Sequence, residues 1–356
     1  MKLFNKLWKK ILIVCVLLSV SSTYFIGSYF VNYALVANSG GKNRPDKKNL
    51  SSEETIKEKR KKYLEDMRDK WLVDVASLTK DVGIRTSDGL NLYGHTYSQP
   101  EKTDKWIILV HGYQSSEKKA QMLGANFYKL GYNVLTYSLR GHEPSDGTYI
   151  GMGGKDSEDL LKFVDYILKI NTHAQITLHG TSMGGATVLN ASGFDLPKNI
   201  TSIIDDCGYS SLWEIFAKEL SLRFNLPSFP VLNMANTMAQ IKAGFNIKEI
   251  NPIDQVSKSK VPIMFIHTTG DDFIPKEMTD EMFEKKKGIK EKLIIQGFRH
   301  ADAVYADKDY FKKIDDFIKK NSVKPSKWNK VMRNFKYLIT LFSFILLIFA
   351  WSNNII

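Results

Sequence analysis

The sequence predicts an α/β fold in which helices cover both faces of a mostly parallel β-sheet. Short apolar runs, typical of buried strands, alternate between residues 82 and 321 with longer segments of helical periodicity. A glycine-rich pentapeptide, residues 180–184, joins one such strand to one such helix, as parallel sheets require. Two long apolar segments near the ends of the chain, starting near residues 11 and 335, stand outside this alternation.

Each strand is predicted from its β-branched and apolar residues and from the turn residues that bound it. The opening pair is a hairpin, because Asp88-Gly89 favours a tight turn. The further strands are expected over residues 106–110, 133–137, 175–179, 202–206, 261–267 and 292–296. Helices are expected near residues 53–72, 117–130 and 156–170, after the pentapeptide, and near residues 302–320.

The pentapeptide Gly180-Thr181-Ser182-Met183-Gly184 has the pattern G-x-S-x-G. A serine on a tight strand-to-helix turn takes a strained backbone, and glycines two residues away on each side leave room for it. The turn lifts the Ser182 hydroxyl clear of the sheet. It also places the backbone N–H of Met183 at a helix N-terminus, where that group can stabilise an oxyanion. The same pattern also occurs in ordinary turns, so the residues elsewhere in the chain must show whether Ser182 is catalytic.

Two downstream side chains follow buried strands in the order that such a serine needs. Asp271 comes after the strand 261–267, and His300 comes after the strand 292–296. The carboxyl ends of parallel strands meet at one edge of a sheet, so both side chains can reach Ser182. Each residue taken singly has an ordinary explanation, since aspartate is common in turns and a lone histidine is often a surface residue. The three residues together favour a site.

A third feature lies upstream, where the strand 106–110 runs into His111-Gly112-Tyr113. A turn at this place commonly supplies a second backbone N–H to an oxyanion hole, here that of Tyr113. His111 is then expected to be structural.

These motifs carry a family resemblance. Besides the segments above, they include Ser87-Asp88-Gly89-Leu90, Leu139-Arg140-Gly141-His142 and Arg299-His300-Ala301. Over residues 82–320 the chain resembles the serine α/β-hydrolases, in particular a bacterial membrane-anchored branch related to acyl esterases and prolyl-oligopeptidase-type peptidases.

The resemblance implies a role for each motif residue. Ser182 is the nucleophile, His300 the general base and then acid, and Asp271, rather than its neighbour Asp272, orients the imidazole. The chain departs from the family at Glu143, where a glycine usually follows the Arg-Gly-His segment. That departure bears on substrate fit and leaves the triad intact.

Residues 209–250 interrupt the alternation of strands and helices and predict a helical cap over the site. Two helix-like pieces, 212–224 and 231–243, flank a segment with two prolines. Most of the apolar cap residues are expected to pack the cap onto the core, and the others to line an acyl or aromatic pocket. The candidates are Trp213, Phe216, Leu220, Phe224, Met234 and Met238.

The formal charge of +12 is concentrated at the chain ends. Residues 1–70 carry +8 and residues 319–356 carry +7, so the central part carries −3. This distribution favours attraction to an anionic membrane surface over binding of nucleic acid. Residues 11–37 contain no charge and can span a bilayer. Because a small-x-small cleavage site is missing, an uncleaved anchor is expected.

The expected organisation has five parts. They are an N-terminal membrane anchor (1–37), a linker with an amphipathic helix (38–81), the core (82–208 and 251–321), the cap (209–250) and a C-terminal apolar segment (335–352) that is a possible second membrane segment. The basic residues that precede the last segment favour an inward domain by charge alone. Since large domains translocate despite charge and the resemblance is to envelope-facing enzymes, the extracellular face is expected.

The reaction class has several candidates. The first is hydrolysis of acyl esters through a Ser-His-Asp triad, and the second is an exopeptidase or amidase on the same fold. The substrate is then a small-molecule acyl ester or a short peptide. An acyltransferase and a non-catalytic, membrane-tethered binding protein remain open. Neither metal nor cofactor is expected, because Cys15 and Cys207 lie far apart and the sequence holds no metal-ligand spacing.

Overall fold

An eight-stranded sheet forms the centre of the fold, in a computed structural model that describes residues 2–37, 39 and 51–322. The strand order is β1-β2-β4-β3-β5-β6-β7-β8. The strands are β1 (Thr79–Arg85), β2 (Asn91–Tyr97), β3 (Lys105–Val110), β4 (Asn133–Tyr137), β5 (Gln175–Thr181), β6 (Ile200–Asp206), β7 (Ile263–Thr268) and β8 (Lys290–Ile295). Strand β2 runs antiparallel to both of its neighbours, β1 and β4, and the other five strand pairs of the described sheet are parallel, which confirms the mostly parallel sheet that the sequence predicts.

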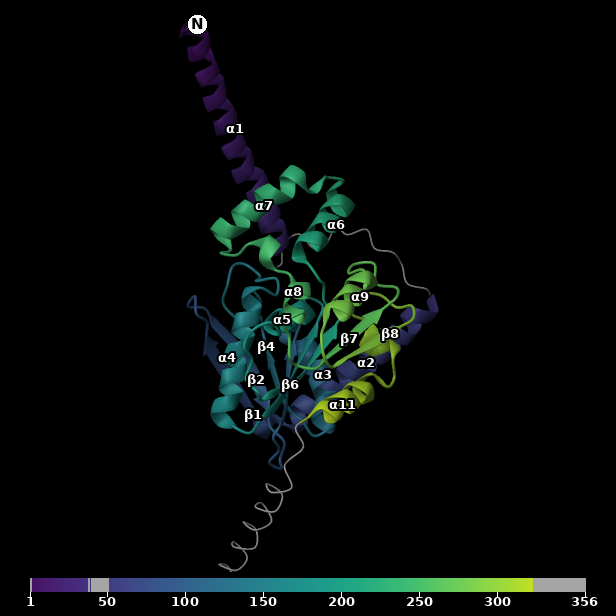
Figure 1. The fold of residues 1–356 in the computed structure, drawn as a ribbon. Helices are drawn as coiled ribbons and strands as arrows, with labels where there is room; N and C mark the ends of the chain where they lie inside the picture. The colour runs from purple at the N-terminus through teal and green to yellow at the C-terminus, as the bar shows by residue number, and fades with distance from the viewer. Residues whose placement is uncertain (1, 38, 40–50, 323–356) are drawn as a thin grey trace, which may run out of the picture. The chain divides into compact units, whose positions relative to one another are not determined.

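Helices lie on both sides of this sheet (Figure 1). They are α1 (Lys2–Leu35), α2 (Ser51–Asp74), α3 (Glu117–Lys129), α4 (Lys155–Ile170), α5 (Met183–Ala191), α6 (Leu212–Phe224), α7 (Ser228–Lys242), α8 (Pro252–Val256), α9 (Lys276–Lys285), α10 (Ala303–Ala306) and α11 (Tyr310–Asn321). Short 3-10 helices cover Ala76–Leu78 and Ile247–Glu249. Helices α6 and α7 form the cap expected between β6 and β7.

The alternation of side chains along β3 shows how one strand serves two cores. Ile107 and Leu109 pack with residues of α2, α3 and α11 on one face of the sheet. Ile108 and Val110 pack with residues of α4 and α5 on the other. Successive side chains of a strand point to opposite faces, so a strand buried on both sides must be apolar throughout. The sequence 106–110 meets this requirement.

The amphipathic helix expected in the linker region is α2, and it packs against the core. Leu64 and Trp71 are buried in the core that α2 shares with α3 and α11, whereas Ile56 and Tyr63 are about half exposed. Arg60 donates to the carbonyl of Val304 (3.1 Å), which ties α2 to α10. The linker region was expected to run to residue 81, but β1 already begins at residue 79.

The closing helix expected over residues 302–320 is interrupted. Asp307 takes an extended backbone between α10 and α11, and its carboxylate accepts the N–H of Asp309 (2.8 Å). An aspartate side chain that bonds to a backbone N–H two residues ahead competes with helix formation. The apolar segment expected at 335–352 lies outside the described residues.

Helix α1 differs most from the expected organisation. Its last nine residues, 27–35, do not belong to a separate anchor but pack into the domain, where Val31 and Leu35 are buried. Gly27 faces α7 so closely that a Cβ there would overlap the carbonyl oxygen of Met234. The carbonyl of Leu35 accepts the N–H of Ile150 (2.7 Å). Figure 1 shows the rest of α1 leaving the domain beside α6 and α7.

Candidate active site

Ser182 occupies a strained turn between β5 and α5. Its backbone has φ 59° and ψ −120°, in the region that residues with a side chain rarely adopt. The N–H of Ser182 donates to the carbonyl of Asp206 at the end of β6 (2.8 Å), which fixes the turn against the neighbouring strand. A Cβ at Gly180 would overlap the carbonyl of Gly184, so this pair of glycines is required by packing.

A chain of short hydrogen bonds joins the three residues that the sequence singles out. The hydroxyl of Ser182 lies 2.7 Å from Nε2 of His300, and Nδ1 of His300 lies 2.6 Å from Oδ2 of Asp271. The three side chains come from loops that follow β5, β8 and β7. All three loops lie at the carboxyl edge of the sheet, which is why residues 118 positions apart can meet.

The carboxylate of Asp271 is fixed from several directions. Its Oδ1 accepts the backbone N–H groups of Phe273 and Ile274, both at 2.9 Å. Burial by itself would raise the pKa of Asp271, but the charge of His300 and hydrogen bonds from His267 and His300 outweigh burial and lower this pKa. The carboxylate is therefore ionised at neutral pH. Asp272 points elsewhere and faces Arg299 (3.4 Å).

His267 is a member of this arrangement that the sequence did not single out. It is fully buried at the end of β7, and its Nε2 lies 3.3 Å from Oδ2 of Asp271. The hydroxyl of Thr279 contacts its Nδ1 (2.7 Å). The imidazole of His267 thus contacts the same carboxylate oxygen as Nδ1 of His300. The only sequence signal was its place four residues before Asp271, where a buried polar residue interrupts an apolar strand.

The two residues expected to supply backbone N–H groups to an oxyanion, Met183 and Tyr113, both line the cavity beside Ser182. Met183 is the first residue of α5, and the first N–H groups of a helix have no partner within it. Tyr113 lies on the loop after β3, and its hydroxyl donates to the carbonyl of Ala34 in α1 (2.8 Å). His111 stands behind this loop, where its Nε2 accepts the N–H of Leu139 (3.1 Å). Burial lowers the pKa of His111 to about 3, so its imidazole is neutral.

Buried polar groups lie near the turn that carries Ser182. The hydroxyl of Tyr310 donates to Asp206 (2.8 Å), whose pKa is raised by burial to about 6. Cys207, Asp271 and His300 offer ligand atoms within 4.8 Å of one another, as the only such group of three or more among the described residues. Burial raises the pKa of the Cys207 thiol well above its ordinary value, and thiols bind metal as thiolates. The hydrogen-bonded chain therefore explains this cluster better than a metal does.

An apolar cavity of about 110 Å³ opens on one side of Ser182, many times the space one water molecule needs. Of the cap residues predicted to line a pocket, Phe216, Leu220 and Phe224 do so. Trp213, Met234 and Met238 do not. Met234 and Met238 lie against Gly27 of α1 instead, and Trp213 lies beneath the ammonium group of Lys248 (4.4 Å).

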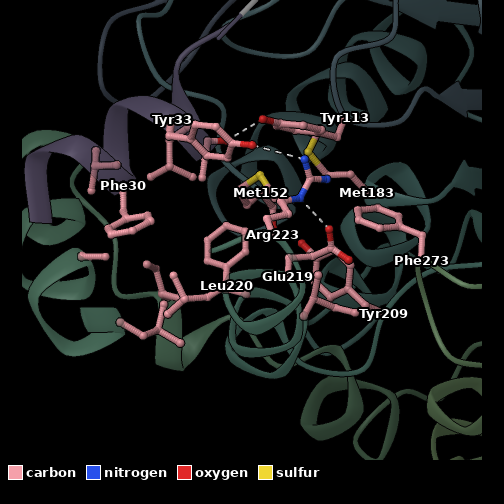
Figure 2. Close-up of a pocket in the computed structure, with 18 of the residues that line it drawn as sticks. Phe30, Tyr33, Tyr113, Met152, Met183, Tyr209, Glu219, Leu220, Arg223 and Phe273 are labelled. Carbon is pink, nitrogen blue, oxygen red and sulfur yellow. Dashed lines mark hydrogen bonds and ion pairs between the residues drawn. The ribbon is translucent and has the colours of Figure 1, made fainter. Parts of the chain in front are cut away.

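The part of the cavity wall that the sequence did not reveal comes from α1. Phe30, Val31, Tyr33, Ala34 and Leu35 all line the cavity. Figure 2 shows Phe30 and Tyr33 of α1 across from the side where Tyr113, Met183 and Phe273 lie. An uncharged apolar helix has the same sequence pattern whether lipid or protein covers it, so no local signal marked these residues.

A second cavity, of about 350 Å³, lies on the His300 side of Ser182. It is more polar, and α2 contributes to its wall. Three lysines line it, Lys57, Lys61 and Lys119, together with Asp206 and Asp302. Lys57 pairs with Asp302 (3.2 Å). Ser182 thus stands between an apolar cavity and a polar one, and His300 contacts only the polar one.

The chain is similar to proteins of known family. A family model described as serine aminopeptidase, S33, matches residues 101–206. The uncharacterized protein YqkD of Bacillus subtilis is 30% identical over 237 residues, which cover 66% of this chain and 77% of that protein. The uncharacterized protein YfhR of Salmonella typhi is 24% identical over 63% of this chain and 75% of that protein.

Solved structures share the fold. The Pyrococcus furiosus esterase Pf2001 superposes with a TM-score of 0.57 at 24% identity, over 70% of this chain and 95% of that one. An acylaminoacyl peptidase of Pyrococcus horikoshii superposes with a TM-score of 0.53 at 17% identity, over 71% of this chain and 44% of that one. Together with the parallel sheet, the matched family and the similar esterases and peptidases give the expected assignment. The chain belongs to the serine α/β-hydrolase family.

Proposed function

We propose that this protein hydrolyses acyl esters, with Ser182 as nucleophile, His300 as general base and Asp271 as the residue that orients His300. The observation that carries the proposal is the chain of hydrogen bonds from Ser182 through His300 to Asp271. A hydroxyl becomes nucleophilic when a positioned imidazole takes its proton, and the imidazole needs a partner that fixes its tautomer. The assembled chain favours an enzyme over a binding protein on the same fold.

The reaction proceeds in two halves. Oγ of Ser182 attacks the ester carbonyl while its proton passes to Nε2 of His300, and the oxyanion rests on the N–H groups of Met183 and Tyr113. The tetrahedral intermediate then expels the alcohol, which takes the proton from His300, and an acyl-enzyme remains. Water, deprotonated by His300, attacks the acyl-enzyme and releases the acid and the free serine.

The two cavities divide the substrate between them. His300 must reach the oxygen of the departing alcohol, so the alcohol part lies on the His300 side, in the polar cavity. The acyl part then extends into the apolar cavity, whose wall includes Met183 but not His300.

The same geometry makes an aminopeptidase the weaker candidate. Recognition of a free amino terminus needs an acidic group in the site. The acidic residues of α6 are Glu214 and Glu219, and Glu214 is exposed. Glu219 does line the apolar cavity, but its carboxylate accepts a hydrogen bond from Nε of Arg223 (2.7 Å). The guanidinium of Arg223 therefore neutralises the negative charge of Glu219, which the ammonium group of a peptide substrate would need.

Helix α1 is the proposed anchor of the protein. In the described part of the chain it is the one helix long and apolar enough to cross a membrane, over Leu7–Leu35. A cleaved signal sequence is disfavoured because removal of α1 would expose Val31 and Leu35 and break the bond from Tyr113 to Ala34. We place the domain on the extracellular face, on the family resemblance.

Labelling with a fluorophosphonate tests the nucleophile. The full-length protein in membranes is expected to react, and Ser182→Ala to lose the label and about 10⁶-fold in kcat for p-nitrophenyl butyrate. Ser192→Ala, at the far end of α5, removes a buried hydroxyl that bonds only within the helix and should keep both signals. Labelling that survives in Ser182→Ala would refute the assignment. A cell-impermeant probe on intact cells reports the membrane face, since an inward domain would stay unlabelled.

The lysines of the polar cavity give a prediction about the alcohol part. Lys61→Met is expected to lower kcat/KM two- to tenfold for a butyrate ester of a carboxylate-bearing phenol, because about 1 kcal/mol of attraction is lost. A neutral phenol of matched leaving-group pKa should be unaffected, and added salt should reduce the difference. Lys62→Met, on the exposed side of α2, is the matched control. Equal losses for both esters would show that Lys61 does not act through charge.

A further inference from the structure

Helix α1 consists of two parts with different surroundings. Residues 27–35 are packed against the cap and the core, whereas residues 7–26 have mostly exposed side chains. At 1.5 Å per residue the exposed part is about 30 Å long, close to the hydrocarbon thickness of a bilayer, and its charged residues, Lys9 and Lys10, lie at the end away from the domain, where lysine side chains reach the membrane surface. If residues 7–26 cross the hydrocarbon region, residue 27 lies at its edge. The cap, which packs against residues 27–35, then lies at the membrane surface.

The exposed side chains of the cap agree with this placement. Phe229 and Ile241 are 74% and 70% exposed, at opposite ends of α7. Lys242, next in the chain, lies with its ammonium group 5.8 Å from the ring centre of Tyr24 in α1. Tyrosine and lysine next to a spanning segment are typical of the membrane–water interface. The end of α7 thus lies at the level where α1 leaves the bilayer.

The apolar cavity lies directly behind this surface. We call it the acyl chamber, and define it by the α1 residues Phe30, Tyr33 and Ala34 and the cap residues Leu220 and Val231. Phe30 belongs both to the chamber wall and to the small core shared by α6 and α7. Without α1 the chamber would lose this wall and open to its surroundings.

The charges inside the acyl chamber compensate one another. Glu219 and Arg223 are the only charged residues among those that line it. They are paired at 2.7 Å, and Arg223 also lies 3.3 Å from the hydroxyl of Tyr33 (Figure 2). This bridge fastens α6 to α1 and leaves no net charge on the wall. An uncharged, flexible hydrocarbon chain is the ligand that such a wall fits best.

We propose that the acyl chamber binds the acyl chain of an ester resident in the bilayer, so that the anchor helix is also the element that sets acyl-chain specificity. This inference rests on the proposed function, because Ser182 must form the acyl-enzyme at the inner end of the chamber. The substrate is an amphiphile whose chain passes from the bilayer along α1 into the chamber, while its alcohol part occupies the polar cavity.

The test uses the full-length protein in phosphatidylcholine vesicles and p-nitrophenyl esters of 4 to 16 carbons. Val231→Phe narrows the chamber and is expected to lower the ratio of kcat/KM for the dodecanoate to kcat/KM for the butyrate at least tenfold. Phe30→Ala enlarges the chamber and is expected to raise the dodecanoate-to-butyrate ratio at least threefold. Phe25→Ala, the same change on the exposed part of α1, should leave this ratio as in the native protein.

A second comparison addresses the route of the substrate. A hexadecanoyl ester is placed either in the vesicles that hold the protein or in separate vesicles. We expect hydrolysis at least tenfold faster in shared vesicles, and equal rates would overturn delivery from the bilayer.

The outcomes separate the two proposals. If butyrate hydrolysis depends on Ser182 but the chain-length ratio is the same in Phe30→Ala, Val231→Phe and Phe25→Ala, the chamber assignment is wrong and the proposed function stands. If no ester is hydrolysed in a Ser182-dependent manner, both fail. If Val231→Phe does not fold, Phe30→Ala against Phe25→Ala still decides, because it removes atoms and cannot cause overlap.

Discussion

Asp271→Asn is expected to lower kcat about 10⁴-fold, while Asp272→Asn is expected to change kcat less than threefold. The carboxylate of Asp271 holds Nδ1 of His300 at 2.6 Å and also accepts two backbone N–H groups. An asparagine that keeps the backbone contacts turns its NH₂ towards Nδ1 of His300. This favours the tautomer with the proton on Nε2, which then cannot take the proton of Ser182. The measurement is pre-steady-state acylation by p-nitrophenyl butyrate.

The neighbouring aspartate makes a stringent control. Asp272→Asn removes the same charge one residue away, but Asp272 faces Arg299 rather than His300. If the loss came from charge in this loop alone, both variants would lose activity to a similar extent. Similar losses, or a larger loss in Asp272→Asn, would contradict the role of Asp271. Circular dichroism of both variants checks that the fold is kept.

Arg140→Met is expected to destabilise the protein by about 3–5 kcal/mol, although Arg140 does not contact Ser182, His300 or Asp271. Its guanidinium makes two hydrogen bonds to Asp159 (2.7 and 2.8 Å) and two to Asp88 (2.8 and 3.2 Å). Arg140 and Asp159 are almost fully buried. Methionine fills much of the volume but leaves a buried carboxylate without its partner. Denaturant unfolding of the full-length protein measures the loss.

Two comparisons show whether the loss is electrostatic. Lys155→Met removes a cation 3.1 Å from Asp88 at a more exposed place and should cost at most about 1 kcal/mol. Burial already raises the pKa of Asp159, and loss of Arg140 raises it further. The carboxyl then binds a proton more readily in the folded state, so the deficit of Arg140→Met should be smaller at pH 5 than at pH 8. A deficit that is the same at pH 5 and pH 8 would indicate lost packing instead.

The sequence was sufficient for the sheet and for the hydrogen-bonded chain at Ser182. The buried strands can be predicted from the sequence because nearly every residue of β3 and β7 faces a core and must be apolar. The turn at Ser182 can also be predicted from neighbouring residues alone, since its strained backbone needs glycines at fixed spacing around Ser182. Asp271 and His300 followed from topology, because parallel strands bring their carboxyl ends to one edge.

The sequence was a poor guide to what surrounds the site. It named six cap residues for a pocket, of which Trp213, Met234 and Met238 pack elsewhere. The helical pattern of α7 shows which residues are apolar but not which partner they meet. Likewise, Ile56 and Leu64 are both apolar residues of α2, yet only Leu64 is buried. Each of these choices depends on a neighbour distant in sequence.

By itself, then, the sequence determined the fold class, the residues that meet at Ser182 and an N-terminal helix long enough to cross a bilayer. Only the tertiary structure decided that residues 27–35 of that helix form a wall of the cavity beside Ser182. Local patterns record the polarity that a residue needs, because burial in lipid and burial in protein remove the same apolar surface from water. Which of the two covers a helix is set by shape, here by the close approach that Gly27 permits to α7.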